Sequence, residues 1–155
     1  MTPRFDYSVA APEGMKALAG VHGYVARCGL PKALIELAYL RASQINGCAY
    51  CIGLHSRALL DEGMAIDKIF LVPAWREAGA LFSPREQAAL AWAETVTKVA
   101  ETNVPDADFE AARRQFDEKE LTDLTIAIGL MNIYNRLAIS ARKPPDAAAP
   151  SSDPR

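Results

Sequence analysis

One stretch in the first third of the chain decides the fold: Gln44-Ile45-Asn46-Gly47-Cys48-Ala49-Tyr50-Cys51-Ile52-Gly53-Leu54-His55. Asn46-Gly47 is typical of a helix end, because glycine enters the left-handed conformation at little cost. The residues that follow predict a new helix that begins at Cys48. On that helix Cys48, Cys51 and His55 occupy positions i, i+3 and i+7 and therefore share one face.

Outward from this stretch, apolar residues recur at helical spacing and no segment alternates long enough to predict a strand. The pattern predicts an all-α fold, a bundle of about six to seven helices. Pro31 and the capping-box sequence Ser83-Pro84-Arg85-Glu86 mark two of the helix starts. The last helix is apolar on most sides, so we expect it to lie centrally. The expected helices span 12–27, 31–46, 48–62, 66–72, 84–100, 106–116 and 118–141.

Length and composition favour one compact domain. The chain has 155 residues, 50% hydrophobic and 23% charged, which is ordinary for a globular protein with one core. We expect a single helical domain over residues 1–143. Residues 144–155, rich in Pro, Ala, Ser and Asp, are expected to form a disordered tail.

Charge and hydropathy argue against several classes of partner. The net charge is -2 and Lys and Arg form no cluster, so neither nucleic acid nor a membrane surface is an expected partner. The most apolar stretch, Leu124 to Met131, is shorter than the roughly 20 residues that cross a bilayer. Three cysteines without an apolar leader indicate a reducing compartment, so the expected location is cytoplasmic.

The cysteine pair and the histidine carry the predicted chemistry. Both sulfur atoms would lie in the first turn of their helix, where unpaired N–H groups and the helix dipole favour an anion. The thiolate is the nucleophilic form of cysteine, and His55 supplies a base. A second thiol within reach traps a sulfenic acid as a disulfide before it oxidises further. The pattern therefore predicts a thiol oxidoreductase.

Other readings of these residues remain open. A Cys-x-x-Cys pair can be two small buried hydrophobic residues, and a zinc site could use Cys28, Cys48, Cys51 and His55 as a Cys3His ligand set. Against zinc, Cys28 has no close ligand partner. Glu36 either forms an i,i+4 ion pair with Lys32 on a solvated face or is held by its apolar helix for proton relay.

At these residues the sequence resembles the alkyl hydroperoxidase D family, within the carboxymuconolactone decarboxylase-like group. The family pattern is a glutamate, eleven residues, Cys-x-x-Cys and a histidine four residues later, which Glu36, Cys48, Cys51 and His55 match. The resemblance extends over about Ala10 to Arg142. Further similar blocks are Arg41 to Cys48, Trp75-Arg76-Glu77, Phe82 to Glu86, and Asn132 to Leu137.

The resemblance implies a thiol-dependent peroxidase in antioxidant defence, with no cofactor and no metal. It implies that a hydroperoxide oxidises Cys51, that Cys48 resolves the product as an intramolecular disulfide, and that Glu36 and His55 relay protons. A dithiol reductant protein or a small thiol would return the electrons. The resemblance also implies a homo-oligomer, with a hexamer favoured.

The sequence departs from the family at two positions. Tyr50 stands where the founding member has a histidine, and Gly53 stands where many single-domain relatives have an acidic residue. Tyr50 is read as a packing aromatic, with a hydrogen bond to peroxide as the alternative. Three polar residues of the last helix, Asn132, Asn135 and Arg136, line a pocket or else satisfy helix ends or a subunit interface. The alternatives for the whole chain are a lactone decarboxylase-type lyase and a zinc-binding or interaction module.

Overall fold

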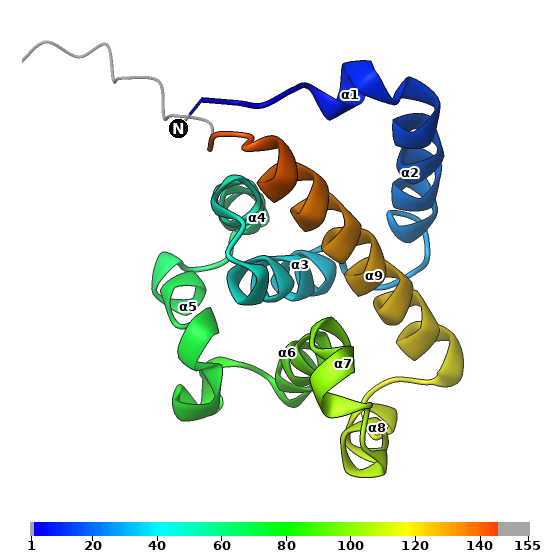
Figure 1. The fold of residues 1–155 in the computed structure, drawn as a ribbon. Coiled ribbons are helices and arrows are strands. Elements are labelled where there is room, and N and C mark those ends of the chain that lie inside the picture. Colours follow the sequence, from blue (N-terminus) through cyan, green and yellow to red (C-terminus); the bar gives the residue numbers. More distant parts are fainter. Residues whose placement is uncertain (1, 146–155) are drawn as a thin grey trace, which may run out of the picture.

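The computed structural model describes residues 2–145 as a bundle of helices (Figure 1). No β-strand occurs within these residues, which confirms the all-α prediction. The α-helices are α1 (Tyr7–Ala10), α2 (Pro12–Val25), α3 (Lys32–Asn46), α4 (Ala49–Asp61), α5 (Ile66–Phe70), α6 (Pro84–Thr97), α7 (Val99–Thr102), α8 (Asp106–Arg113) and α9 (Glu118–Ala141). Two 3-10 segments, η1 (Val72–Glu77) and η2 (Gly79–Leu81), connect α5 to α6. Residues 146–155 of the predicted tail lie outside the described residues.

Each of the seven expected helices is present, with corrections at its ends. Pro31 is the N-cap of α3 and not its first residue, because its ψ of 133° is extended. The segment around Pro73 is a 3-10 helix and does not continue α5. The expected helix 84–100 ends at Thr97, where Lys98 leaves helical geometry before α7. The sequence prediction missed α1, whose start is capped by the side chain of Asp6.

Helix α3 is the central element of the bundle. It contacts α4, α6 and α9 more extensively than any other helix does, and Figure 1 shows it between them. A first hydrophobic cluster joins α3 to α2, α6 and α9 and includes Tyr39 and Ile128. A second cluster, which includes Leu37 and Leu59, joins its other side to α4, α5, η1 and α6. Because both sides of α3 are buried, its side chains can position a site inside the bundle.

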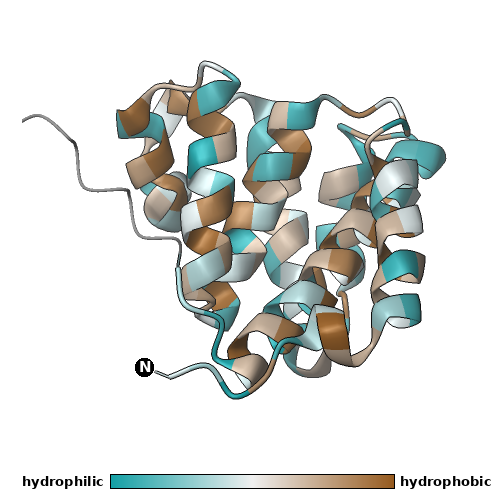
Figure 2. Cartoon of the chain, turned by 90° about the horizontal axis from the view of Figure 1, so that it is seen from above, coloured by the Kyte–Doolittle hydropathy of each residue, from teal (hydrophilic) through white to brown (hydrophobic). Residues whose placement is uncertain are grey.

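Helix α9 is long and crosses the bundle diagonally beside α2 and α3 (Figure 1). By length and composition alone this helix could cross a membrane, although the core helix of a bundle meets the same criteria. The apolar stretch Leu124 to Met131, considered in the sequence, covers only part of the apolar length of this helix. Here the helix packs against five others, although Ile126 and Ile133 stay exposed. Hydrophobic and hydrophilic residues are interspersed along the helices, as expected for amphipathic helices that bury one face (Figure 2).

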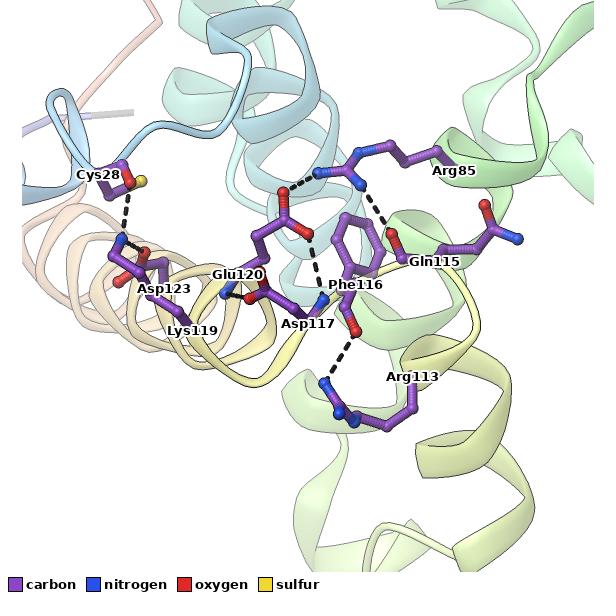
Figure 3. A network of polar contacts seen from close by, with 9 residues as sticks. All are labelled: Cys28, Arg85, Arg113, Gln115, Phe116, Asp117, Lys119, Glu120 and Asp123. Atoms are coloured by element: carbon purple, nitrogen blue, oxygen red, sulfur yellow. Dashed lines mark hydrogen bonds and ion pairs between the residues drawn. The ribbon is translucent and has the colours of Figure 1, made fainter.

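The start of α9 is fastened to the neighbouring helices by polar contacts (Figure 3). The carboxylate of Asp117 accepts from the N–H of Glu120, and the Asp117 N–H donates to the Glu120 carboxylate, which forms a capping box. Arg85 of α6 donates to Glu120 over 2.6 Å and to the Gln115 carbonyl over 2.7 Å. Arg85 therefore ties α6 to the start of α9.

Glu94 of α6 joins two more of those blocks. Its carboxylate accepts from Arg41 of α3 over 2.7 Å, from Arg76 over 2.6 Å and from the Trp75 indole over 3.0 Å. Burial by itself raises the pKa of Glu94, but hydrogen bonds from Trp75, Arg76 and Arg41 outweigh it and hold the pKa below its usual value. The carboxylate therefore locks η1 and α3 to α6.

We expect Glu94→Gln to destabilise the protein by about 2 kcal/mol at pH 7, because it leaves Arg41 without its partner in a mostly buried setting. Since the folded pKa of Glu94 is depressed, this stabilisation is present above the ordinary carboxyl pKa and is lost as pH falls below it. Urea unfolding at pH 7 and near pH 3.5 measures the difference. Exposed Glu101→Gln is the control. An equal cost at both pH values would contradict the electrostatic account.

Candidate functional site

The cysteine pair lies where α3 ends and α4 begins. Gly47 takes the left-handed conformation with φ of 71° and ends α3, as Asn46-Gly47 predicts. Cys48 is the N-cap of α4, and its sulfur accepts from the Cys51 N–H at 3.3 Å. The two cysteines form a disulfide with their Cα atoms 5.3 Å apart. The helix thus begins one residue later than predicted, and both sulfur atoms still lie at its N-terminus.

Glu36 and His55 form a pair that connects α3 to α4. His55 Nδ1 and Glu36 Oε2 are 2.7 Å apart, and both side chains are largely buried. Because an ionised carboxylate only accepts hydrogen bonds, Glu36 fixes the ring proton on Nδ1 and leaves Nε2 as the basic nitrogen. Lys32 binds Glu62 over 2.6 Å, so the alternative i,i+4 pair of Lys32 with Glu36 is wrong.

A cavity of about 270 Å³ opens beside this pair, and both Cys51 and His55 lie on its wall. Four tyrosines form much of the remaining wall: Tyr7, Tyr39, Tyr50 and Tyr134. Cys48 does not line this cavity and instead lines a separate hollow of about 330 Å³ near the end of α9. A small molecule in the cavity would therefore meet Cys51 first.

Tyr50 combines packing with a place on the cavity wall. The Lys143 ammonium lies over the Tyr50 ring, 4.2 Å from its centroid, in a cation–π contact. The same ammonium lies 5.5 Å from the centroid of the Tyr7 ring. Burial alone would lower the pKa of Lys143, but hydrogen bonding and charge interactions with Tyr50 and Tyr7 raise it. Gly53 is covered by the Arg57 side chain, whose guanidinium lies 3.5 Å from the position of a Cβ. Position 50 therefore supplies a phenol to the cavity wall, and position 53 supplies no side chain.

Asn132, Asn135 and Arg136 of α9 lie near the end of α3 and do not line the cavity. Asn46 donates to Asn132 over 3.0 Å and to Asn135 over 2.8 Å, and Asn135 donates to Ser43 over 3.0 Å. Arg136 donates to the carbonyl and side-chain oxygens of Asn132. The cavity is not lined by Asn132, Asn135 or Arg136, and the two asparagines bond instead to side chains in the last turn of α3. The network fixes the residues that directly precede Cys48.

We expect Asn135→Ala to lower the free energy of unfolding by about 2 kcal/mol, because Asn135 is fully buried and its loss leaves Ser43 without its partner and Asn46 with Asn132 alone. Thermal or urea unfolding measures this cost. Ser140→Ala, an exposed change on the same helix, should cost less than about 0.5 kcal/mol. Equal costs for the two variants would show that the network does not stabilise the helix end.

Cys28 lies apart from this site. It is a free, partly buried cysteine after α2, and its carbonyl accepts from Lys119 (Figure 3). Within residues 2–145, no group of three or more His, Cys, Asp or Glu side chains is placed to hold a metal ion. The described residues therefore offer no Cys3His ligand set that includes Cys28.

Tyr39 and His22 are among the cavity residues that the sequence reasoning missed. Tyr39 packs on His55 with ring centroids 5.1 Å apart, and its hydroxyl is buried without a hydrogen-bond partner. His22 of α2 lines the same cavity. Tyr39 sits three residues after Glu36 on α3, so helical spacing could have suggested it. No local signal joins His22 to a motif that lies on another helix.

Comparison with known proteins places this geometry in a family. The carboxymuconolactone decarboxylase family profile matches residues 12–95. The uncharacterized protein YdfG of Bacillus subtilis is 34% identical over 140 residues, which are 90% of this chain and 95% of YdfG. The alkyl hydroperoxide reductase AhpD of Corynebacterium aurimucosum is 39% identical over 46 residues, 30% of this chain and 26% of that protein.

The fold has a close counterpart among solved structures. The crystal structure of ATU0492 from Agrobacterium tumefaciens, a protein of unknown function proposed to be the antioxidant defence protein AhpD, superposes with a TM-score of 0.91. The two chains are 38% identical, and the match covers 95% of this chain and all of the other. From the profile, the near full-length relative and the shared fold, the chain belongs to the carboxymuconolactone decarboxylase family, with alkyl hydroperoxidase D-like architecture.

Proposed function

We propose that the protein is a dithiol-dependent peroxidase that reduces a hydroperoxide through Cys51 and Cys48. The observation that carries the proposal is that Cys51, bonded to Cys48, lies on the wall of one cavity together with His55, whose ring is held by Glu36. A thiol pair at a helix N-terminus next to an oriented imidazole has the groups that thiol oxidation requires.

The reaction cycle uses each of these groups. Nε2 of His55 takes the Cys51 proton, and the thiolate attacks one peroxide oxygen, so an S–O bond forms and the O–O bond breaks. The leaving alkoxide takes a proton and departs as an alcohol. The Cys48 sulfur then attacks the Cys51 sulfenic acid: an S–S bond forms, the S–O bond breaks, and the Cys48 proton goes to the leaving hydroxide, which departs as water. A dithiol reductant supplies two electrons and two protons to restore both thiols.

The division of labour between the cysteines follows from their surroundings. Cys51 is 3% exposed and lines the cavity, whereas Cys48 is 1% exposed and does not. The Cys48 residue is also the N-cap, so its sulfur lies beside the free N–H groups of α4. These placements support Cys51 as the oxidised residue and Cys48 as the resolving residue.

The proposal extends to partners and location. A dithiol protein or a small thiol is the reductant, and the cytoplasm, where thiols are kept reduced, suits this cycle. We also propose a homo-oligomer, with a hexamer favoured. Ile126 and Ile133 on α9 and Phe109 on α8 are exposed apolar side chains, and association would cover them.

Thiol counting tests the cycle directly. The reduced protein should consume an organic hydroperoxide in the presence of a dithiol and should lose two thiols per chain after one equivalent of peroxide, with no intermolecular disulfide. The peroxide-treated protein should keep one reactive thiol, that of Cys28. If peroxide leaves all three thiols intact, the proposed function is wrong.

A further inference from the structure

The second histidine of the chain points to a binding function within the cavity. The chain has two histidines, and both line the cavity that holds Cys51. His22 lies in the last turn of α2, is exposed, and its ring forms no hydrogen bond or ion pair with any residue from 2 to 145. An unpaired imidazole on a cavity wall is available to a ligand.

The Tyr39 hydroxyl, on the same cavity wall, is a buried polar group without a partner. The residue is 2% exposed, and its hydroxyl is the one buried side-chain polar atom of residues 2–145 that lacks a hydrogen bond. Burial and the nearby Glu36 charge raise the pKa of Tyr39, so the hydroxyl keeps its proton and can donate. Leaving such a donor unpaired is costly, so an acceptor that reached it would stabilise the site.

His22 and Tyr39 lie at the same place in the molecule. A smaller cavity of about 110 Å³ adjoins the first, and these two residues are the ones that line both. Lys32 also lines the smaller cavity, as does Glu36, whose carboxylate is already engaged by His55. The Lys32 ammonium is likewise engaged, by Glu62, so the junction offers a ligand an imidazole and a hydroxyl donor.

The rest of the larger cavity limits what can bind. Among the described residues, no Asp or Glu lines it, and Leu54, Met131 and Ala138 add apolar surface to the tyrosines. Its volume of about 270 Å³ lies just below the range of about 300–1,000 Å³ typical of ligand pockets. A ligand with one ring or a short chain fits, and its anionic end would face two donors.

We propose that the substrate is a small organic hydroperoxide that also carries a carboxylate, and that His22 and Tyr39 form the subsite for that carboxylate. The peroxide end then faces Cys51, and the apolar body lies among the tyrosines. This inference rests on the proposed function for the identity of the reacting group. The subsite itself rests on the two unpaired donors at the cavity junction.

Binding of an unreactive probe tests the subsite without turnover. We expect the oxidised protein to bind 3-phenylpropanoate about tenfold more tightly than its neutral amide, as a charge-assisted hydrogen bond predicts. His22→Gln should reduce this preference to about twofold, Tyr39→Phe should weaken it, and His22→Lys should preserve it. Calorimetry or ligand-observed NMR measures the dissociation constants.

Lys16→Gln is the matched control, because it removes a positive charge from an exposed position of the same helix. It should leave the preference for the acid unchanged. Equal binding of acid and amide by the parent protein, or a preference that survives His22→Gln, would overturn the proposal.

Turnover gives the second measurement. For two aryl hydroperoxides that differ only in a carboxylate, the ratio of kcat/KM should favour the acid and should fall about tenfold in His22→Gln. A ratio unaffected by His22→Gln would overturn the assignment of His22. If neither hydroperoxide is consumed, the proposed function fails, and the probe still decides whether the carboxylate subsite exists.

Discussion

Replacing Cys51 with serine is expected to abolish hydroperoxide reduction, with a fall in turnover of about 10³-fold or more. Cys51 is the cysteine on the cavity wall, and a serine hydroxyl neither ionises at neutral pH nor forms a sulfenic acid. Hydroperoxide consumption with a dithiol reductant measures the effect. Cys28→Ser, which changes the cysteine outside the site, should keep the parent rate.

Cys48→Ser should separate the two steps. Peroxide should still oxidise Cys51 once, and the sulfenic acid should persist long enough to be trapped by a 1,3-dione and detected by mass. If Cys51→Ser keeps the parent turnover and its Cys48 is trapped as a sulfenic acid, then Cys48, and not Cys51, is the residue that peroxide oxidises. Loss of a carboxylated lactone, undiminished in the double cysteine variant, would instead favour a lyase of the same superfamily.

The sequence was most informative where local spacing alone sets geometry. Cys51 and His55 lie on one short helix with Cys48 as its N-cap, and a period of 3.6 residues sets their relative directions whatever the rest of the chain does. The Gly47 stop and the Ser83 capping box are local in the same sense, because each depends on backbone groups within a few residues. The order and type of the helices could therefore be predicted.

The sequence was least informative where contacts join distant helices. Whether Glu36 faces Lys32 or His55 depends on how α3 packs on α4, and Lys32 turned out to bind Glu62. The same limit applies to His22, which reaches the cavity from α2. The expected central place of α9 was also only partly correct. Buried Asn135 and exposed Ile133 lie two residues apart on that helix, and only tertiary packing distinguishes them.

The dependence of the site on Glu36 gives the second large effect. We expect Glu36→Gln to slow the reaction of Cys51 with hydroperoxide by about 10²-fold, in the range for lost general acid–base catalysis. An amide at 2.7 Å from Nδ1 can donate as well as accept, so it no longer fixes the ring proton or stabilises the imidazolium. Rapid mixing of the reduced protein with peroxide, followed by thiol loss, measures the rate.

Two further variants show whether Glu36 acts through its charge. Glu36→Asp keeps a carboxylate on a shorter side chain and should recover part of the rate, which a purely structural role would not predict. Glu62→Gln is the matched control, since it also removes one partner of an ion pair at α4 but lies on its exposed end. Proton transfer from Cys51 needs His55 in one tautomer, which Glu36 sets. If Glu36→Gln and Glu62→Gln react with hydroperoxide at the same rate, His55 does not depend on the Glu36 carboxylate and the prediction is wrong.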